Sequence, residues 1–343
     1  MRGLSPGLHV TLHVDPLTIH TWSVLCGLSM LASEKSIRLD VRDLGFDDEV
    51  YTLMLLVHDR SSGTRTSVSL AVGDAGRSDR TRRESMADLS FRRSARDGDG
   101  TIPLGMLVGA VSGKEPTKSY LGSTLHRAIR RRSLTGARRT LSALSPKARF
   151  PSIGEYEQGA AMRGSGKVFF QPRAWDPKDG GDPGDRESVN EHRARLIRVL
   201  RAELGPRFIG GFVPSDYARA NYGDLLSTES SERSHYLKRL RNADIGISSI
   251  GLHGSTPFKI PEYLAAGRAI LSEPLRFQVG PDPGLAVSTF ESVADCIGQL
   301  DALLSDQTAL AERQDAALAY WKQHVRPDQV MARMLRKVQE AIR

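Results

Sequence analysis

The chain has 343 residues, of which 39% are hydrophobic and 26% are charged, and it carries a formal net charge of +8 at pH 7. This length favours two domains, and the composition excludes a chain that is largely disordered. No apolar run reaches the roughly 18 residues that a membrane-spanning helix needs, and the amino terminus lacks the apolar stretch of a signal peptide. We therefore expect a cytoplasmic protein, either soluble or peripherally attached to the inner face of the membrane.

The first half of the chain begins with the pattern of a Rossmann-like domain. His9–Val14 is predicted to be a strand, residues 21–33 an amphipathic helix, and Ile37–Leu44 a second, alternating strand. Two more strands, Tyr51–His58 and Thr66–Val72, are separated by a turn signal. We expect these two strands to form an antiparallel hairpin that decorates the sheet.

The end of this half differs in composition. Residues 85–94 predict a strand at the edge facing the second domain, and residues 145–159, rich in Pro, Gly and Ser, indicate a linker. Between them lies a basic cluster made of Arg127, Arg130, Arg131, Arg132, Arg138, Arg139, Lys147 and Arg149. Aromatic residues that could stack on bases are almost absent around it, so a membrane surface or an acidic acceptor fits better than nucleic acid, and a solvated face is an open alternative.

The second half alternates strands and helices. Lys167–Gln171 predicts a strand, residues 189–204 an amphipathic helix, Arg207–Phe212 a strand, and a further helix leads into Ala243. This βαβαβ order is typical of a parallel sheet. Farther on, we expect a strand at 286–288, a helix at 292–304 and a final helix whose apolar period runs from Met331 to Ile342.

One stretch, Ala243–Pro274, holds the strongest functional signal. It predicts a buried strand at 243–248, a turn of small and hydroxyl residues at 251–257, a helix at 261–266 ended by Gly267, and a strand at 269–272. A turn of this kind before a helix offers unpaired backbone N–H groups to an anion. Lys259 adds a positive charge, and Glu262 can accept from two vicinal hydroxyls, which together suggest a nucleoside diphosphate. The alternative is an ordinary packing turn with a solvated Lys and Glu.

Lys259, Glu262, Tyr263 and Gly267 form a Lys-x-x-Glu-Tyr-x-x-x-Gly pattern that resembles the donor-binding segment of GT-B glycosyltransferases. The resemblance implies an α/β fold of two Rossmann-like domains that face a cleft, with a C-terminal helix crossing back to the first domain. It implies an acceptor-binding domain at about 1–155, a nucleotide-sugar-binding domain at about 160–325 and a C-terminal helix at 326–343.

The resemblance also implies roles for single residues. Ser255 and Thr256 would meet the donor phosphates, and Glu262 would meet the ribose. Arg173 and Lys178, five positions apart after the first strand of the second half, match cations that reach the diphosphate in many GT-B proteins, although Pro172 replaces the usual glycine. His253 and Gly254 lie in the phosphate turn, and Gly254 stands where retaining enzymes commonly carry a Glu.

His20 follows the first predicted strand, in the loop where inverting GT-B enzymes place a catalytic His. An imidazole can deprotonate an acceptor hydroxyl near neutral pH, while a helix-capping or exposed His is the alternative. The resulting hypothesis is a metal-independent glycosyltransferase that moves a sugar from a nucleotide-sugar to a glycan, lipid-linked or small-molecule acceptor. It needs no cofactor beyond this co-substrate. Replacing Glu262 by Ala is expected to weaken nucleotide binding and leave the fold intact.

Other motifs fail on spacing. The sequence Gly164-Ser165-Gly166-Lys167 lacks the upstream glycine of a phosphate loop, and no strand leads into a dinucleotide-binding Gly-x-Gly-x-x-Gly. Cys26 and Cys296 lie far apart in apolar patterns and are expected to be core residues in a reducing compartment. The remaining alternative function is a noncatalytic protein that binds a polyanion through residues 127–149.

Overall fold

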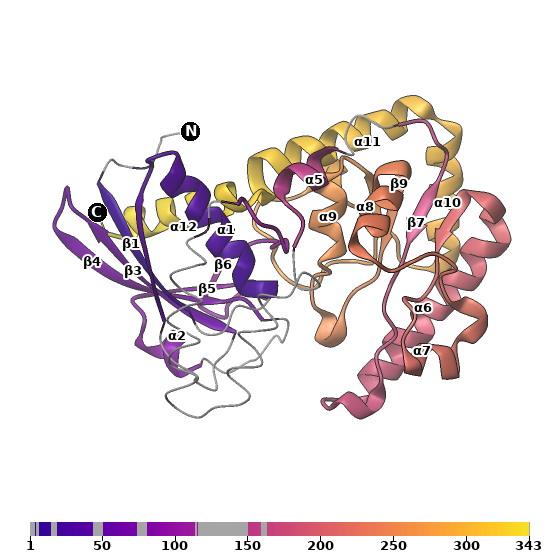
Figure 1. The fold of residues 1–343 in the computed structure, drawn as a ribbon, viewed down its shortest axis with the longest axis horizontal. Helices are drawn as coiled ribbons and strands as arrows, with labels where there is room; N and C mark the ends of the chain where they lie inside the picture. Colours follow the sequence, from indigo (N-terminus) through magenta and orange to yellow (C-terminus); the bar gives the residue numbers. More distant parts are fainter. Residues whose placement is uncertain are drawn as a thin grey trace. The chain divides into compact units, whose positions relative to one another are not determined.

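The computed structural model describes residues 4, 7–14, 19–43, 51–73, 81–113, 115, 150–158 and 163–342. The chain divides into two compact units. Unit 1 consists of Met1–Ile153, Phe277–Pro281 and Gln323–Arg343, and unit 2 of Gly154–Arg276 and Asp282–Lys322. Each unit has its own β-sheet and its own helices (Figure 1).

Unit 1 contains a mixed sheet with the strand order β2-β1-β3-β4-β5-β6. The strands are β1 (Leu8–Val14), β2 (Arg38–Asp43), β3 (Thr52–Asp59), β4 (Thr64–Ala71), β5 (Leu89–Arg92) and β6 (Ile102–Pro103). β1 pairs with β2 in parallel and with β3 antiparallel, and the antiparallel pair β3–β4 continues into the parallel pairs β4–β5 and β5–β6.

The β3–β4 hairpin therefore lies in the middle of the sheet, and the expectation that it only decorates the sheet is wrong. Its register explains why. Val57 and Leu55 of β3 stand opposite Val10 and Leu12 of β1, and all four side chains are buried. The alternating apolar residues of the hairpin thus extend one continuous core face.

Two helices pack against each other in unit 1, namely α1 (Ile19–Ser33) and α12 (Pro327–Ile342). They approach closely at Gly27, where an added Cβ would stand 2.2 Å from the carbonyl oxygen of Pro327. α12 buries Met331, Met334 and Leu335. The last helix thus returns to the first unit, as predicted. The short helix α2 (Arg82–Met86) also belongs to unit 1, and α5 (Ile153–Glu157) begins at the last residue of its first segment and continues into unit 2.

Unit 2 contains a parallel sheet with the strand order β11-β10-β9-β7-β8. The strands are β7 (Val168–Phe170), β8 (Phe208–Gly210), β9 (Ile245–Ser248), β10 (Ala269–Ser272) and β11 (Ser288–Thr289). The helices are α6 (Pro183–Leu204), α7 (Asp216–Asn221), α8 (Arg233–Asn242), α9 (Lys259–Ala265), α10 (Val293–Ser305) and α11 (Gln307–Tyr320). The predicted βαβαβ alternation is confirmed.

Short helical turns connect these elements. They are η3 (Pro177–Asp179), η4 (Gly205–Arg207), η5 (Gly223–Leu225), η6 (Leu252–Gly254), η7 (Gly284–Ala286) and the π-helix η8 (Trp321–Val325). Local sequence sets the boundaries of the helices beside them. Asp182 caps α6 and Pro183 occupies its first turn, and Gly267 follows α9 with a φ of 63°. The predicted glycine stop of α9 is therefore confirmed.

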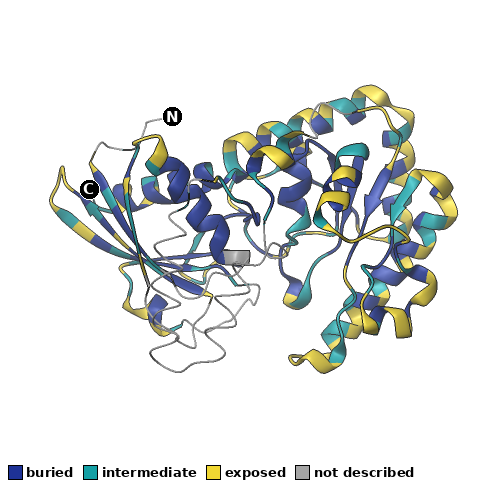
Figure 2. Cartoon of the chain, in the orientation of Figure 1, coloured by how far each residue is buried: buried dark blue, intermediate teal, exposed yellow. Residues whose placement is uncertain are grey.

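Helices cover both faces of the unit 2 sheet. Val168 and Phe170 of β7 belong to a hydrophobic cluster with Leu196 of α6 and Leu300 of α10. Phe169, which points to the opposite face, contacts Tyr236 of α8 with ring centroids 5.5 Å apart. The three central strands, β7, β9 and β10, are accordingly buried along their length, while the outer sides of the helices are exposed (Figure 2).

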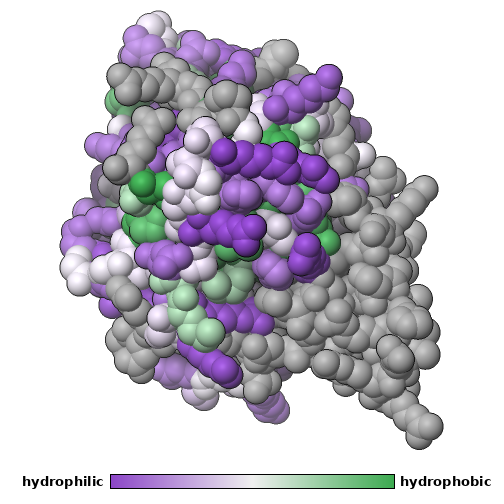
Figure 3. Space-filling model, turned by 90° about the vertical axis from the view of Figure 1, so that its left-hand side faces the viewer, coloured by the Kyte–Doolittle hydropathy of each residue, from purple (hydrophilic) through white to green (hydrophobic). Residues whose placement is uncertain are grey.

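These features confirm the predicted fold class, an α/β protein with two sheet-containing units and a C-terminal helix that returns to the first. Among the described residues, none of the helices combines the length and the apolar character required to cross a membrane. On the face of the molecule drawn in Figure 3, hydrophilic side chains separate smaller hydrophobic areas. Cys26 and Cys296 are both buried as free thiols.

Candidate functional site

The topology of unit 2 determines where a ligand is most readily held. β7 and β9 are neighbours, yet the chain leaves β7 toward β8 on one side and leaves β9 toward β10 on the other. In parallel sheets, the loops that diverge at such a switch point leave a crevice beyond the carboxyl ends of the strands. The loop that begins at Gln171 and the turn at 251–257 both start at this edge. Arg173, Lys259 and Glu262 follow these two strands.

Glu262 is the centre of a cluster that joins three helices. Its Oε1 accepts from the hydroxyl of Tyr156 on α5 at 3.2 Å and lies 3.4 Å from Nη1 of Arg233 on α8. Its Oε2 accepts from the hydroxyl of Tyr236 and from Nζ of Lys259, the latter at 3.2 Å. A carboxylate has about four lone-pair positions, so these donors saturate it.

The same cluster sets the charge state of the carboxyl group. Burial opposes ionisation of Glu262, but Lys259, Arg233 and the Tyr236 hydroxyl outweigh it and hold the pKa below its ordinary value. Burial and the neighbouring carboxylate raise the pKa of the Tyr156 and Tyr236 hydroxyls. The cluster therefore contains an ionised carboxylate that accepts from two neutral phenols and two cations.

Lys259 lies at the edge of this cluster. The side chains of Lys259 and Arg233 are 35% and 37% exposed, whereas the Glu262 side chain is only 7% exposed. Nζ of Lys259 also stands 3.8 Å from the centre of the Tyr236 ring. Burial lowers the pKa of Lys259, Glu262 opposes this shift, and the charges of Arg233 and Arg173 add smaller effects that lower the pKa. The predicted site cations Arg173 and Lys259 are thus close enough to interact electrostatically.

Lys178, by contrast, is exposed on η3, where Asp176 caps the turn by accepting from the Lys178 backbone N–H. Nothing in the described contacts connects its ammonium group to the Glu262 cluster. Arg173 is exposed as well. Of the two cations expected after β7, the structure therefore brings Arg173 into electrostatic range of Lys259.

The turn at 251–257 uses several of the N–H groups that were expected to hold phosphate. Gly251 donates to the carbonyl of Ser255, Gly254 to Gly251, and Ser255 to Leu252. The N–H of His253 donates to Oδ2 of Asp185 on α6 at 2.8 Å, and the imidazole Nδ1 lies 3.7 Å from the same oxygen. Ser255 and Thr256 are buried, each 5% exposed.

Gly254 has a left-handed backbone conformation that favours glycine. Its φ is 72°, and an added Cβ would lie 2.6 Å from Cδ of Arg276, an exposed residue that sequence reasoning did not single out. Arg276 places one more positive charge beside the turn.

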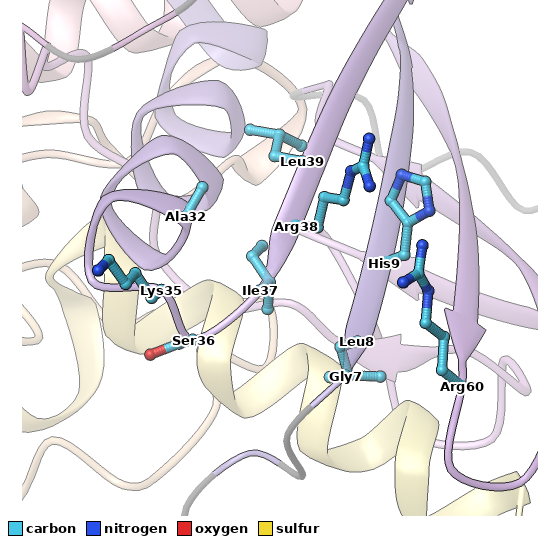
Figure 4. A pocket seen from close by; sticks show the side chains of 10 residues that line it. All are labelled: Gly7, Leu8, His9, Ala32, Lys35, Ser36, Ile37, Arg38, Leu39 and Arg60. Atoms are coloured by element: carbon cyan, nitrogen blue, oxygen red, sulfur yellow. The ribbon is translucent and has the colours of Figure 1, made fainter.

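In unit 1, His20 is the second residue of α1 rather than a loop residue, and its side chain lies outside the described part of the chain. A cavity of about 440 Å³ opens at the other, amino end of β1 and β2, lined in part by His9, Lys35, Arg38 and Arg60 (Figure 4). It is not the site that the sequence predicts. The basic cluster, residues 127–149, also lies outside the described residues.

Sequence reasoning missed Tyr156, Arg233, Tyr236 and Asp185 as members of the site. Tyr156 and Glu262 are 106 positions apart, and no motif connects them. Tyr236 and Asp185 come from α8 and α6, and no motif includes them either. Within the described ranges, no group of three or more His, Cys, Asp or Glu residues is arranged to hold a metal ion.

Searches against protein-family models and against curated proteins found no match. Among solved structures, the chain is similar to HepE from Anabaena in complex with UDP and glucose, at 10% identity and a TM-score of 0.37, covering 96% of this chain and 99% of that one. It is similar to the C-terminal domain of a glycosyl transferase group 1 family protein from Francisella tularensis, at 10% identity and a TM-score of 0.32, covering 48% and 88%.

It is also similar to a putative UDP-N-acetylglucosamine 2-epimerase from Listeria monocytogenes, at 12% identity and a TM-score of 0.37, covering 76% of this chain and 61% of that one. The chain spans about half the length of the wall teichoic acid polymerase TagF, which it matches over 48% of that protein. At these identities and TM-scores, the similarities assign no role to any residue of this chain.

Proposed function

We propose that the protein is a glycosyltransferase that uses a nucleotide-sugar, with the donor bound at the carboxyl edge of the unit 2 sheet. The observation that carries this proposal is the contact of Arg233 and Lys259 with one buried carboxylate, Glu262, at a switch point between parallel strands, with Arg173 near enough to Lys259 to lower its pKa. Three cations and one carboxylate leave two positive charges at this edge. Such a balance suits the diphosphate of a nucleoside diphosphate.

A saturated carboxylate can still receive a ribose if its partners are exchanged. Arg233 and Lys259 are the partly exposed donors of the cluster, whereas Tyr156 and Tyr236 are buried. When a diphosphate attracts the two cations, one acceptor position on each oxygen of Glu262 becomes available to a ribose hydroxyl. The phenols keep the carboxylate in place during this exchange, because they occupy its remaining acceptor positions.

In the proposed reaction, an acceptor hydroxyl oxygen bonds to the anomeric carbon of the donor sugar as the bond from that carbon to the diphosphate oxygen breaks. The diphosphate leaves with the bonding electrons, and Arg173 and Lys259 stabilise its negative charge. His20 is proposed to take the proton of the acceptor hydroxyl. The other predicted donor contacts stay predictions, because several backbone N–H groups of the 251–257 turn already donate within the protein. These contacts are Ser255, Thr256, His253, Gly254 and Lys178.

The function is tested by measuring thermal stabilisation with UDP, GDP, ADP, TDP and CMP sugars, followed by a turnover assay with the sugar that stabilises most. One nucleotide class should raise the melting temperature in a concentration-dependent way, because a ligand that binds only the folded state stabilises it. A protein that none of these compounds stabilises would not be a nucleotide-sugar enzyme.

The second candidate, polyanion binding through residues 127–149, has no contact within the described residues to favour it. It predicts strongly salt-dependent binding and no nucleotide-sugar turnover. The cytoplasmic location, the possible membrane contact and the metal independence of the reaction also stay predictions.

A further inference from the structure

Arg193 is a buried arginine that the proposed reaction does not use. It lies on α6 and is 6% exposed. Its Nη1 donates to the carbonyl oxygen of Arg173 at 2.8 Å, its Nε to Oγ of Ser249 at 2.9 Å, and its Nη2 to the carbonyl oxygen of Ile250 at 3.2 Å. One guanidinium therefore holds the loop after β7 and the segment after β9 at a fixed separation.

A carboxylate supports this arrangement from the next strand. Glu273 directly follows β10, and its Oε2 accepts from the backbone N–H of Ile250 at 2.9 Å. Its Oε1 lies 3.4 Å from Nε2 of His192, which precedes Arg193 on α6. Burial lowers the pKa of Arg193 to about 10, and the charge of Glu273 opposes this shift. The loops after three neighbouring strands are thus connected through one hydrogen-bond network.

The contact to Arg173 fixes its backbone and leaves its side chain exposed. A guanidinium has five N–H donors in a rigid planar fork, so it can satisfy three acceptors from two loops at once, which a lysine ammonium on a flexible stem does less well. The Arg193 guanidinium would thereby keep the distance between the Arg173 side chain and the start of the 251–257 turn constant across the switch point.

We infer that Arg193 is a positioning residue for donor binding, which sets the distance between Arg173 and the turn after β9 so that both meet one diphosphate. This inference rests on the proposed function. It requires that Arg193 act through Arg173 and not by direct contact with the ligand.

The test is a double-mutant cycle between Arg193→Lys and Arg173→Ala, read by isothermal titration calorimetry with UDP, GDP and ADP. Arg193→Lys alone should weaken binding of the preferred nucleotide by about tenfold, and it should cause little further loss in the Arg173→Ala background. Ser249→Ala, which removes one acceptor, should give a smaller loss that also disappears in that background. Arg195→Lys, an exposed position on the same helix, is the matched control and should bind as wild type.

The melting temperature separates positioning from simple loss of stability. A purely structural effect of Arg193→Lys would lower the melting temperature equally in the wild-type and Arg173→Ala backgrounds. It would also weaken nucleotide binding in both. Additive losses, or an Arg193→Lys protein with wild-type affinity, would overturn the inference while the proposed function stands. Failure of the wild-type protein to bind any of the three nucleotides would overturn both.

Discussion

The carboxylate of Asp185, in the first turn of α6, accepts a 2.8 Å hydrogen bond from the backbone N–H of His253. A negative charge from the protein thus stands at the turn that was predicted to hold a negatively charged ligand. The same arrangement occurs in the Gly164–Lys167 segment, where the N–H groups of Gly164 and Gly166 donate to Asp244. Both turns bind an anion, and in each case the anion is a side chain.

Replacing Asp185 by Asn should therefore increase the affinity for a nucleoside diphosphate by about fivefold, since two exposed unit charges interact by about 1 kcal/mol at 4 Å in water. Calorimetric titration at low ionic strength measures this change, and added salt should reduce it. Asp179→Asn, an exposed change on η3, is the control. Weaker binding by Asp185→Asn would mean that the ligand needs the Asp185–His253 bond.

Glu262→Ala should destabilise the protein strongly, in contrast to the expectation from sequence that the fold stays intact. The change removes the Glu262 acceptor from two buried phenols and from two partly exposed cations, and a buried donor left unsatisfied costs about 1–3 kcal/mol. Urea unfolding measures the loss. Glu312→Ala, at an exposed position of α11, should change the free energy of unfolding by less than about 0.5 kcal/mol. Equal effects of the two changes would refute the network.

The lowered pKa of Glu262 makes stability depend on acid pH. The group titrates at 4.5 when unperturbed and below that in the folded protein, so its contribution is complete above 4.5 and is lost as the pH falls through the folded value. Urea unfolding between pH 3 and pH 6 should show this decline for the wild type. In Glu262→Gln, the part of the acid dependence that this group contributes should disappear, and an unchanged profile would contradict the assignment.

Two glycine substitutions should have opposite effects. Gly27→Ala should destabilise unit 1 by several kcal/mol, because the new methyl group would overlap the Pro327 carbonyl on α12. Gly298 lies inside α10 with nothing within 4 Å of an added Cβ, so Gly298→Ala should stabilise by about 0.5–1 kcal/mol. Thermal melts of both variants test this. A tolerated Gly27→Ala would mean that α1 and α12 do not approach as closely as described.

The repeating pattern of unit 2 was predictable because local signals determine it. Isoleucines of β9 between small residues indicated a buried parallel strand, and Gly267 indicated the end of α9. The strand order of unit 1 was not predictable, since a hairpin has the same turn signal and the same alternation whether it lies inside a sheet or beside it. The pairing of β3 with β1 depends on the fit of both apolar faces, which periodicity does not encode.

The site shows the same limit. Lys259 and Glu262 could be recognised because they lie three residues apart in the Lys-x-x-Glu-Tyr-x-x-x-Gly pattern. Three other residues of the site come from other elements. Arg233 and Tyr156 are 29 and 106 positions from Glu262 in the sequence. Arg193 is 20 and 57 positions from the two loop residues whose carbonyl groups it contacts. A charged residue such as Arg193 on the buried face of a predicted amphipathic helix is the signal that could have indicated an internal partner.

The central claim is that the cations around Glu262 bind the diphosphate of a nucleotide-sugar. The most direct measurement is the calorimetric affinity of the nucleoside diphosphate preferred in thermal screening, for the wild type, Lys259→Met and Arg233→Gln. Lys238→Met, an exposed change on α8, serves as the control. Each site variant should lose about tenfold in affinity, and the control should bind as wild type. Equal affinity in all four proteins would contradict the claim.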